Sequence, residues 1–172
     1  MFYSTILRRV IQLLRPRRGL AHSDHWEITA PSSLAGLFRA LPAVFEDEAI
    51  LYLESNGTPA KIKRYLNERR SLSTLRIKGG TVLPTPEVFR LPLTAENVDG
   101  LAQLLESERN VGICTHVHVY RGDAVLLEWY DASAGDPVLI DSSVPERIIS
   151  SLCATLGCEY HWKGDPRDGL QT

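Results

Sequence analysis

The first fifteen residues show the hydrophobic spacing of an α-helix. Wound at about 100° per residue, their apolar side chains fill one half of the helical wheel, and arginines with other polar side chains fill the other half. Pro16 ends this pattern, because a proline ring clashes within a helix interior. We therefore predict a basic amphipathic helix within residues 1–20.

Three roles stay open for this N-terminal helix. It can pack on its own domain or on a partner chain, or it can bind an anionic membrane surface through residues 1–15, as basic amphipathic helices do. An organellar transit peptide is the third reading, since the segment is rich in arginine and has no acidic residue. In that case residues 1–20 would not stay on the mature chain.

Residues 21–163 alternate helical and extended patterns, after a link over residues 21–33 that reads as polar. The predicted helix caps are Ser32 or Ser33, Thr58 before Pro59, Thr94, and Ser143 in a capping box with Glu146. Gly157 is placed to end the last helix. We expect strands over residues 49–55, 73–78, 112–120, 125–130, 137–141 and 158–162. The proline-spaced stretch 81–93 is confined to an edge strand or to irregular structure.

These elements predict an α+β fold. A hairpin around residues 121–123 is incompatible with an all-parallel sheet, so we expect a mixed or mainly antiparallel sheet with helices packed on it. The length of 172 residues and the hydrophobic content of 44% suit one domain. We predict a single domain over residues 21–163, followed by a flexible tail over residues 164–172.

Two histidines at alternate positions mark the strand over residues 112–120. Side chains alternate between the two faces of a strand. Val117 and Val119 are therefore expected to face the core, while His116 and His118 share the other face.

The register of the following hairpin decides which side chains meet these histidines. A two-residue loop would mix apolar and polar pairs on both faces. A three-residue loop at 121–123 would pair Val119 with Val125 and place His116 opposite Glu128. We predict the three-residue loop, because register follows the hydrophobic pattern.

One face of this hairpin is a candidate polar site. Its members are His116, His118, Tyr120, Glu128 and Tyr130. Zinc or iron would need a third ligand beside the two histidines, and no spacing in the chain nominates one, so we predict no metal ligand. The chain also lacks the GxSxG nucleophile elbow and the glycine-rich phosphate-binding motifs, so we assign no catalytic residue and no cofactor.

The three cysteines, Cys114, Cys153 and Cys158, favour a reducing compartment. Their number is odd and they form no CxxC pair, so neither a disulfide framework nor a zinc ribbon is indicated. No apolar run approaches the length of about 20 residues that crosses a bilayer. We expect a cytoplasmic protein, and peripheral attachment to a membrane stays open through residues 1–15.

The formal net charge of −2 conceals a split between the two halves of the chain. Residues 1–80 hold 13 Lys and Arg against 7 Asp and Glu, whereas residues 81–172 hold 6 against 14. Besides the N-terminal arginines, one basic block stands out, which we predict to bind a partner: Lys61, Lys63, Arg64, Arg69, Arg70, Arg76 and Lys78. A solvated helix face is the simpler reading of the same block.

Another protein with an acidic surface is the favoured partner for this basic block. Nucleic acid is disfavoured, because aromatic side chains for base stacking are scarce there and the acidic half of the chain repels phosphates.

The charge split and the missing catalytic motifs favour a non-catalytic binding protein of an inhibitor, immunity or adaptor type. Such a protein would act through charged surfaces on a macromolecular partner. The alternative is a metal-dependent hydrolase that uses His116, His118 and a nearby carboxylate. The hydrolase requires an enclosed polar site around the two histidines, which the binding protein does not.

Overall fold

The structure is a computed structural model that describes residues 19–45, 48–73, 85–108, 114–132 and 134–164. The predicted N-terminal helix, the predicted strand over residues 73–78 and the predicted tail over residues 164–172 fall outside these ranges, except for the residues at their margins.

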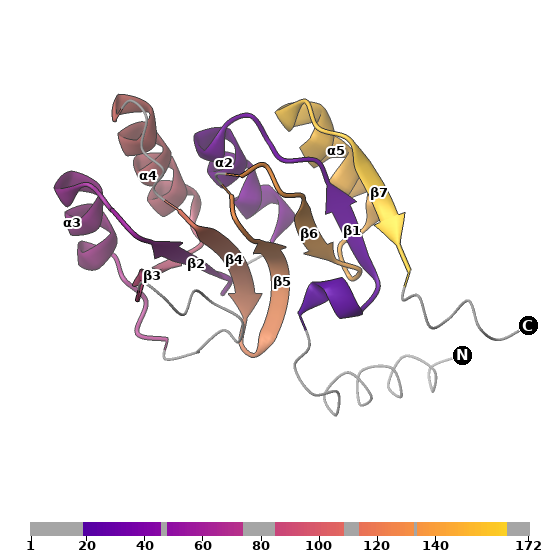
Figure 1. Cartoon of the computed structure of the whole chain (residues 1–172), viewed down its shortest axis with the longest axis horizontal. Helices are drawn as coiled ribbons and strands as arrows, with labels where there is room; N and C mark the ends of the chain where they lie inside the picture. Colours follow the sequence, from indigo (N-terminus) through magenta and orange to yellow (C-terminus); the bar gives the residue numbers. More distant parts are fainter. Residues whose placement is uncertain (1–18, 46–47, 74–84, 109–113, 133, 165–172) are drawn as a thin grey trace, which may run out of the picture.

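The described strands form one antiparallel sheet (Figure 1). Their order across the sheet is β3-β2-β4-β5-β6-β1-β7, and each pairing between described strands is antiparallel. The strands are β1 (His25–Ile28), β2 (Ile50–Ser55), β3 (Glu87–Pro92), β4 (His116–Arg121), β5 (Ala124–Trp129), β6 (Val138–Asp141) and β7 (Tyr160–Lys163). The predicted α+β class, with one domain and a mainly antiparallel sheet, is confirmed.

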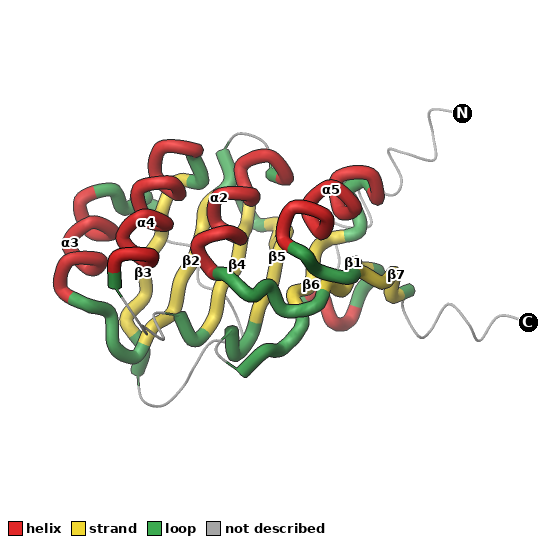
Figure 2. Tube along the Cα trace, turned by 90° about the horizontal axis from the view of Figure 1, so that it is seen from above, coloured by secondary structure: helices red, strands yellow, loops and turns green. Residues whose placement is uncertain are grey.

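The α-helices of the described ranges all cover one face of the sheet (Figure 2). They are α2 (Leu34–Val44), α3 (Ala60–Glu68), α4 (Ala95–Ser107) and α5 (Glu146–Leu156). A short 3-10 helix, η1 (Leu20–His22), packs against β5 and β6. We call the sheet face turned away from α2, α3, α4 and α5 the outer face.

The core lies between these helices and the sheet. It is built from apolar side chains that are at most 1% exposed, among them Leu37, Phe38, Leu51, Leu53, Leu101, Val117, Val119, Leu127, Ile140 and Ile149. Val117 and Val119 face this core as predicted. None of the helices in the described ranges has both the length and the apolar character needed to cross a membrane.

Two of the predicted helix starts and one predicted helix end are confirmed. The Ser33 side chain accepts a hydrogen bond from the Gly36 N–H (3.0 Å) at the start of α2, and the Thr94 side chain accepts one from the Asn97 N–H (3.3 Å) at the start of α4. These bonds satisfy N–H groups that have no partner inside the helix. Gly157 ends α5 with a φ of 67°, a left-handed conformation that glycine adopts without steric cost.

The predicted caps Thr58 and Ser143 are wrong. Helices α3 and α5 begin directly after Pro59 and Pro145, and neither start carries a side-chain cap. A proline suits this position because it brings no N–H that needs a partner. The Ser143 N–H instead donates to Asp141 Oδ1 (2.9 Å), so the predicted capping box is replaced by a turn.

The predicted polar link over residues 21–33 is also wrong, because it contains strand β1. This strand lies between β6 and β7 in the sheet. Trp26 and Ile28 alternate into the core, whereas His25 and Glu27 lie on the outer face. Four residues with only two apolar positions are too short a pattern to stand out from a polar segment, and pairing with both neighbours is what stabilises the strand.

The proline-containing strand β3 occupies one edge of the sheet, as predicted. Proline is tolerated there because the outward-facing side of an edge strand needs no N–H donor.

Gly100 of α4 is expected to tolerate no side chain. A Cβ at this position would lie 2.3 Å from Tyr65 Oη, whose hydroxyl donates to the Asn97 carbonyl oxygen (2.9 Å). We expect Gly100→Ala to lower the free energy of unfolding by about 1 kcal/mol, because the gain in helix propensity is outweighed by displacement of the Tyr65 ring. Urea denaturation measures the change. Gly36→Ala in α2 is the matched control, since its Cβ would meet atoms only at 3.4 Å and beyond, and it is expected to stabilise the chain. Equal effects of the two substitutions would contradict the close α3–α4 contact.

Candidate functional site

The β4–β5 hairpin departs from the predicted register. Its loop consists of two residues, Gly122 and Asp123, and Arg121 pairs with Ala124. A bulge at Leu126 then shifts the register, so that Val119 lies opposite Leu127 and His118 lies opposite Glu128. The predicted pairing of His116 with Glu128 is therefore wrong. The bulge lets a two-residue loop coexist with matched apolar pairs, an option that neither regular hairpin offers.

Polar and aromatic side chains gather at the centre of the outer face. Six residues, which we call the polar cluster, come from three adjacent strands and their ends: Tyr52 and Glu54, His116 and His118, and Glu128 and Tyr130. Strand β2 contributes the first pair, with Tyr52 opposite His118 and Glu54 opposite His116.

The polar cluster is buried, although it lies on the face without the four covering helices. His118 is 0% exposed, and Glu54 and Glu128 are each 2% exposed. Polar side chains with so little exposure need partners, because burial removes the hydrogen bonds that water would supply. The partners of each group therefore define what the cluster can do.

Aromatic rings surround His118. The Tyr52 ring lies 5.6 Å from the His118 ring and the Tyr130 ring lies 5.1 Å from it, centroid to centroid, both in edge-to-face orientation. Tyr130 also meets the His116 ring at 5.1 Å. The Tyr130 ring therefore contacts both histidines, whose own centroids are 6.4 Å apart.

Hydrogen bonds orient the other members of the cluster. The Tyr52 hydroxyl donates to Glu54 Oε1 (2.7 Å), and the Tyr130 hydroxyl donates to Glu128 Oε1 (3.3 Å). Burial and these carboxylates raise the pKa of both tyrosines. The Asp131 N–H donates to His116 Nδ1 (3.1 Å), which requires that nitrogen to be unprotonated and leaves the proton of the neutral ring on Nε2.

His118 is the exception in this network. Within the described residues, neither of its ring nitrogens has a hydrogen-bond partner. Burial lowers the pKa of His118 from 6.5 to about 4, while the nearby Glu54 opposes that shift. His118 is therefore a neutral imidazole at neutral pH, and no described residue hydrogen-bonds to its ring nitrogens.

The backbone at the start of the described chain lies against Glu128. The Leu20 N–H donates to Glu128 Oε2 (2.6 Å), and a Cβ on Gly19 would lie 3.0 Å from the same oxygen. Burial raises the pKa of Glu128, and the bonds from Leu20 and Tyr130 oppose that shift. Glycine at position 19 thus allows the main chain to approach the carboxylate closely.

The structure brings together four of the five residues predicted as a polar site. Tyr120 is the fifth: it shares the face of His116 and His118, but its hydroxyl bonds to Ser73 Oγ (3.2 Å). Sequence reasoning missed Tyr52 and Glu54. The segment 49–55 is apolar enough to look like a strand buried on both faces, but Tyr52 and Glu54 alternate with buried leucines in it, and this alternation is a signal for a second, polar face.

The described residues hold no group of three His, Cys, Asp or Glu side chains arranged to bind a metal ion. The hydrolase reading therefore stays a prediction from sequence. Cys114, next to β4, is buried, and this burial raises the pKa of its thiol to about 12, which suits a small packed side chain and not a nucleophile.

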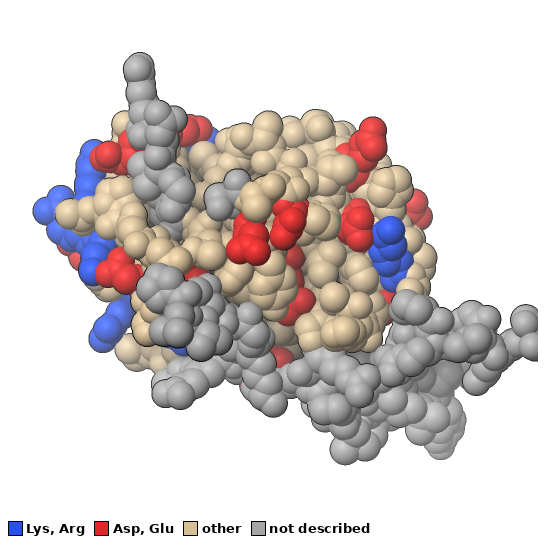
Figure 3. Space-filling view, viewed as in Figure 1, with Lys and Arg blue, Asp and Glu red and all other residues tan. Residues whose placement is uncertain are grey.

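The described part of the basic block lies at one end of the molecule, on α3 and directly after it (Figure 3). Its described members, which we call the α3 surface, are Lys61, Lys63, Arg64, Arg69 and Arg70. Arg76 and Lys78 lie outside the described residues.

The members of the α3 surface differ in their partners. Lys63 pairs with Glu87 of β3, and Arg69 stacks over the Tyr65 ring with its guanidinium carbon 4.2 Å from the centroid. Lys61, Arg64 and Arg70 are exposed, and no ion pair joins them to another described residue. Their charges are therefore open to a partner.

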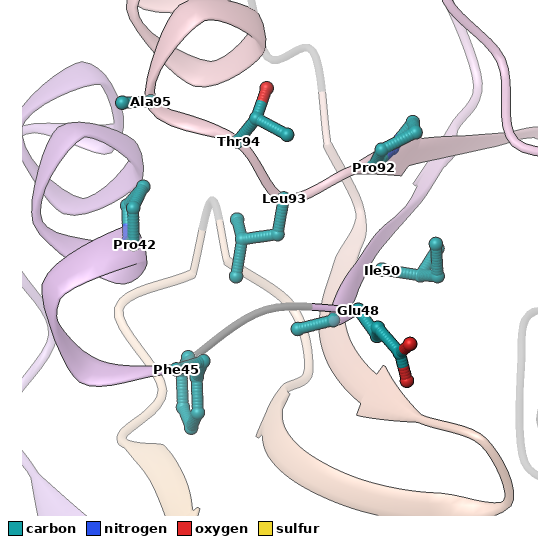
Figure 4. A pocket seen from close by; sticks show the side chains of 9 residues that line it. Pro42, Phe45, Glu48, Ile50, Pro92, Leu93, Thr94 and Ala95 are labelled. Carbon is teal, nitrogen blue, oxygen red and sulfur yellow. The ribbon is translucent and has the colours of Figure 1, made fainter.

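A separate pocket of about 350 Å³ lies where α2 ends and α4 begins (Figure 4). It is lined by Pro42, Phe45, Glu48, Ala49, Ile50, Pro92, Leu93, Thr94 and Ala95. Its lining is mostly apolar, and the carboxylate of Glu48 points away from Leu93 in this view. The pocket contains no residue of the polar cluster or of the α3 surface.

Comparison with known proteins adds no relative to this picture: no family model, no curated protein and no solved structure matches the chain.

Proposed function

We propose that the chain is a non-catalytic binding protein whose α3 surface contacts an acidic patch on a partner protein. The observation that carries this proposal is the concentration of charge. Half of the Lys and Arg side chains in the described ranges lie between residues 61 and 70, whereas acidic side chains outnumber basic ones in the rest of those ranges. Such a dipolar surface steers and orients a partner of complementary charge.

The neighbouring helix supports a protein partner over a nucleic acid. Helix α3 packs against α4, whose exposed acidic side chains include Glu96 and Asp99. A nucleic acid bound to α3 would bring its phosphates close to the acidic side chains of α4. The repulsion between these like charges disfavours a nucleic acid as the partner. A protein can present both signs of charge and match α3 and α4 together.

Charge reversal on α3 tests the proposal. We expect the double substitution Lys61→Glu, Arg64→Glu to weaken partner binding at least about tenfold, mainly through slower association, and we expect added salt to weaken binding of the unaltered chain. The partner is recovered on the immobilised full-length chain from a nuclease-treated lysate, purified, and titrated by calorimetry.

Arg147→Glu with Lys163→Glu is the matched control, because it reverses the same number of exposed charges away from α3. An equal loss of partner binding in both double variants would rule out the α3 surface as the binding site. Unchanged binding by the Lys61→Glu, Arg64→Glu variant would rule it out as well. If material is retained on the chain from an untreated lysate but not from the nuclease-treated one, the α3 surface binds nucleic acid.

A further inference from the structure

In the polar cluster, hydrogen-bond acceptors are in excess over hydrogen-bond donors, an imbalance that a packed core does not need. Both tyrosine hydroxyls donate a hydrogen bond to a carboxylate: Tyr52 donates to Glu54, and Tyr130 donates to Glu128. Around Glu128 the remaining hydrogen-bonding capacity consists mainly of acceptors, namely the Glu128 carboxylate oxygens and one ring nitrogen of His118, together with the aromatic ring of Tyr130. A group that matches this set is a cation with several N–H donors.

The side of the cluster around Glu128 is where this capacity is unfilled. Glu128 is 2% exposed and accepts from the Leu20 N–H and the Tyr130 hydroxyl, and no Lys or Arg of the described residues pairs with it. Directly opposite on β4 is His118, fully buried, with no partner for either ring nitrogen among the described residues. Among the described residues only the imidazoles of His25 and His22 place opposing charge near Glu128, and His118 has no hydrogen-bond partner. A buried carboxylate that no lysine or arginine of the described residues pairs with and a buried imidazole whose ring nitrogens bond to no described residue both cost free energy that one shared ligand would lower.

The other side of the cluster already shows the same chemistry. The guanidinium of Arg90 lies over the Tyr52 ring, 5.3 Å from its centroid. A cation therefore occupies one aromatic face of the cluster, and a second aromatic ring, that of Tyr130, lies beside Glu128, to which its hydroxyl donates.

We propose that Glu128, His118 and Tyr130 form a binding site for a guanidinium or alkylammonium group. Glu128 supplies the opposite charge, His118 accepts a hydrogen bond at one ring nitrogen, and the Tyr130 ring contacts the cation through its face. The site is distinct from the α3 surface, which would bind anionic groups.

Two sources can supply this cation. The chain itself carries Arg8, Arg9, Arg15, Arg17 and Arg18 before Gly19, the residue that lies against Glu128. A separate basic ligand, such as an arginine or lysine side chain of another molecule, has the same chemistry.

Imidazole signals of the full-length chain distinguish these sources. The ring nitrogens of ¹⁵N-histidine-labelled protein are followed by NMR while N-acetyl-arginine amide is added, with the neutral N-acetyl-citrulline amide as the comparison probe. If the ligand is separate, the arginine probe shifts the His118 signals of the unaltered chain saturably and the citrulline probe does not. If the chain supplies the cation, replacing its five N-terminal arginines by Gln shifts the His118 signals, and the arginine probe reverses that shift.

Glu128→Gln is expected to weaken the arginine response at least about tenfold, whereas Glu27→Gln, on the same face in β1, leaves it unchanged. The comparison of the arginine and citrulline probes uses chains with an intact Glu128, so it tests the proposed cation site even if the Glu128→Gln variant does not fold. His118 signals that respond neither to the arginine probe nor to the N-terminal replacements would overturn the proposal, as would an equal response to citrulline.

Discussion

Acidification from about pH 7 to about pH 4.5 is expected to destabilise the unaltered chain by about 2–3 kcal/mol more than it destabilises the variant His118→Phe. The cause is the buried imidazole, whose pKa falls from 6.5 to about 4 in the folded chain. Between about pH 6.5 and about pH 4.5 the unfolded chain mostly carries a proton at His118, whereas the folded chain mostly does not. Stability contributed by the neutral ring is therefore complete above pH 6.5 and is lost as the pH falls toward 4.

Glu128 makes a comparison of two variants necessary. Burial raises its pKa, so the folded chain binds this proton more readily than the unfolded chain, and Glu128 opposes the effect of His118 on acidification. Because both chains keep Glu128, the difference between them isolates the imidazole. At neutral pH the phenylalanine variant is expected to be at least as stable as the unaltered chain, since it removes two buried nitrogens that hydrogen-bond to no described residue.

Urea unfolding followed by tryptophan fluorescence across this pH range measures the two free energies. His161→Phe is the control, because His161 lies on the exposed edge strand β7. We expect its pH profile to match that of the unaltered chain. Parallel pH profiles for the His118→Phe variant and the unaltered chain would show that His118 finds a proton-accepting partner and is not the acid-sensitive group.

Trp26→Ala is expected to lower the free energy of unfolding by about 3–5 kcal/mol. Trp26 is 9% exposed, and its indole N–H donates to the Val144 carbonyl oxygen (2.9 Å). Its ring also meets Tyr160 and Trp162 edge-to-face, at 5.9 Å and 4.7 Å between centroids. Truncation would leave a cavity in the core, break the indole bond and weaken the pairing of β1 with both neighbours.

Trp162→Ala is the matched control for this substitution, because it removes the same side chain from the neighbouring strand. Trp162 is 48% exposed, so its loss is expected to cost only about 0.5–1.5 kcal/mol through the lost aromatic pair. Thermal and urea unfolding of the two variants measure the contrast. A cost for Trp26→Ala no larger than that for Trp162→Ala would mean that β1 does not hold this place in the sheet.

Local sequence patterns predicted the elements whose information lies within one segment. Ser33 and Thr94 cap helices, and Gly157 ends one, because each of these roles depends on residues within a few positions along the chain. The alternation around Val117 likewise determined which face of β4 packs into the core between the sheet and the helices.

The structure of the hairpin and of the polar cluster required contacts between segments far apart in the chain. The bulge at Leu126 satisfies apolar pairing on one face while it sets His118 opposite Glu128 on the other. The sequence of β4 or β5 alone does not determine this register, because register depends on both paired strands. Placement of Tyr52 and Glu54 beside the histidines depends on β2 lying next to β4, which adjacency in sequence does not indicate.

By itself, then, the sequence determined the α+β class, most helices and strands and the inward side of β4, because hydrophobic periodicity and capping are local. Only the tertiary structure decided that β1 is an inner strand and that the HVHV segment belongs to a buried polar cluster. Burial is the physical reason. The two apolar positions of β1 enter the core only because β6 and β7 pair with it on either side, and His118 loses its charge and its water only because neighbouring strands enclose it.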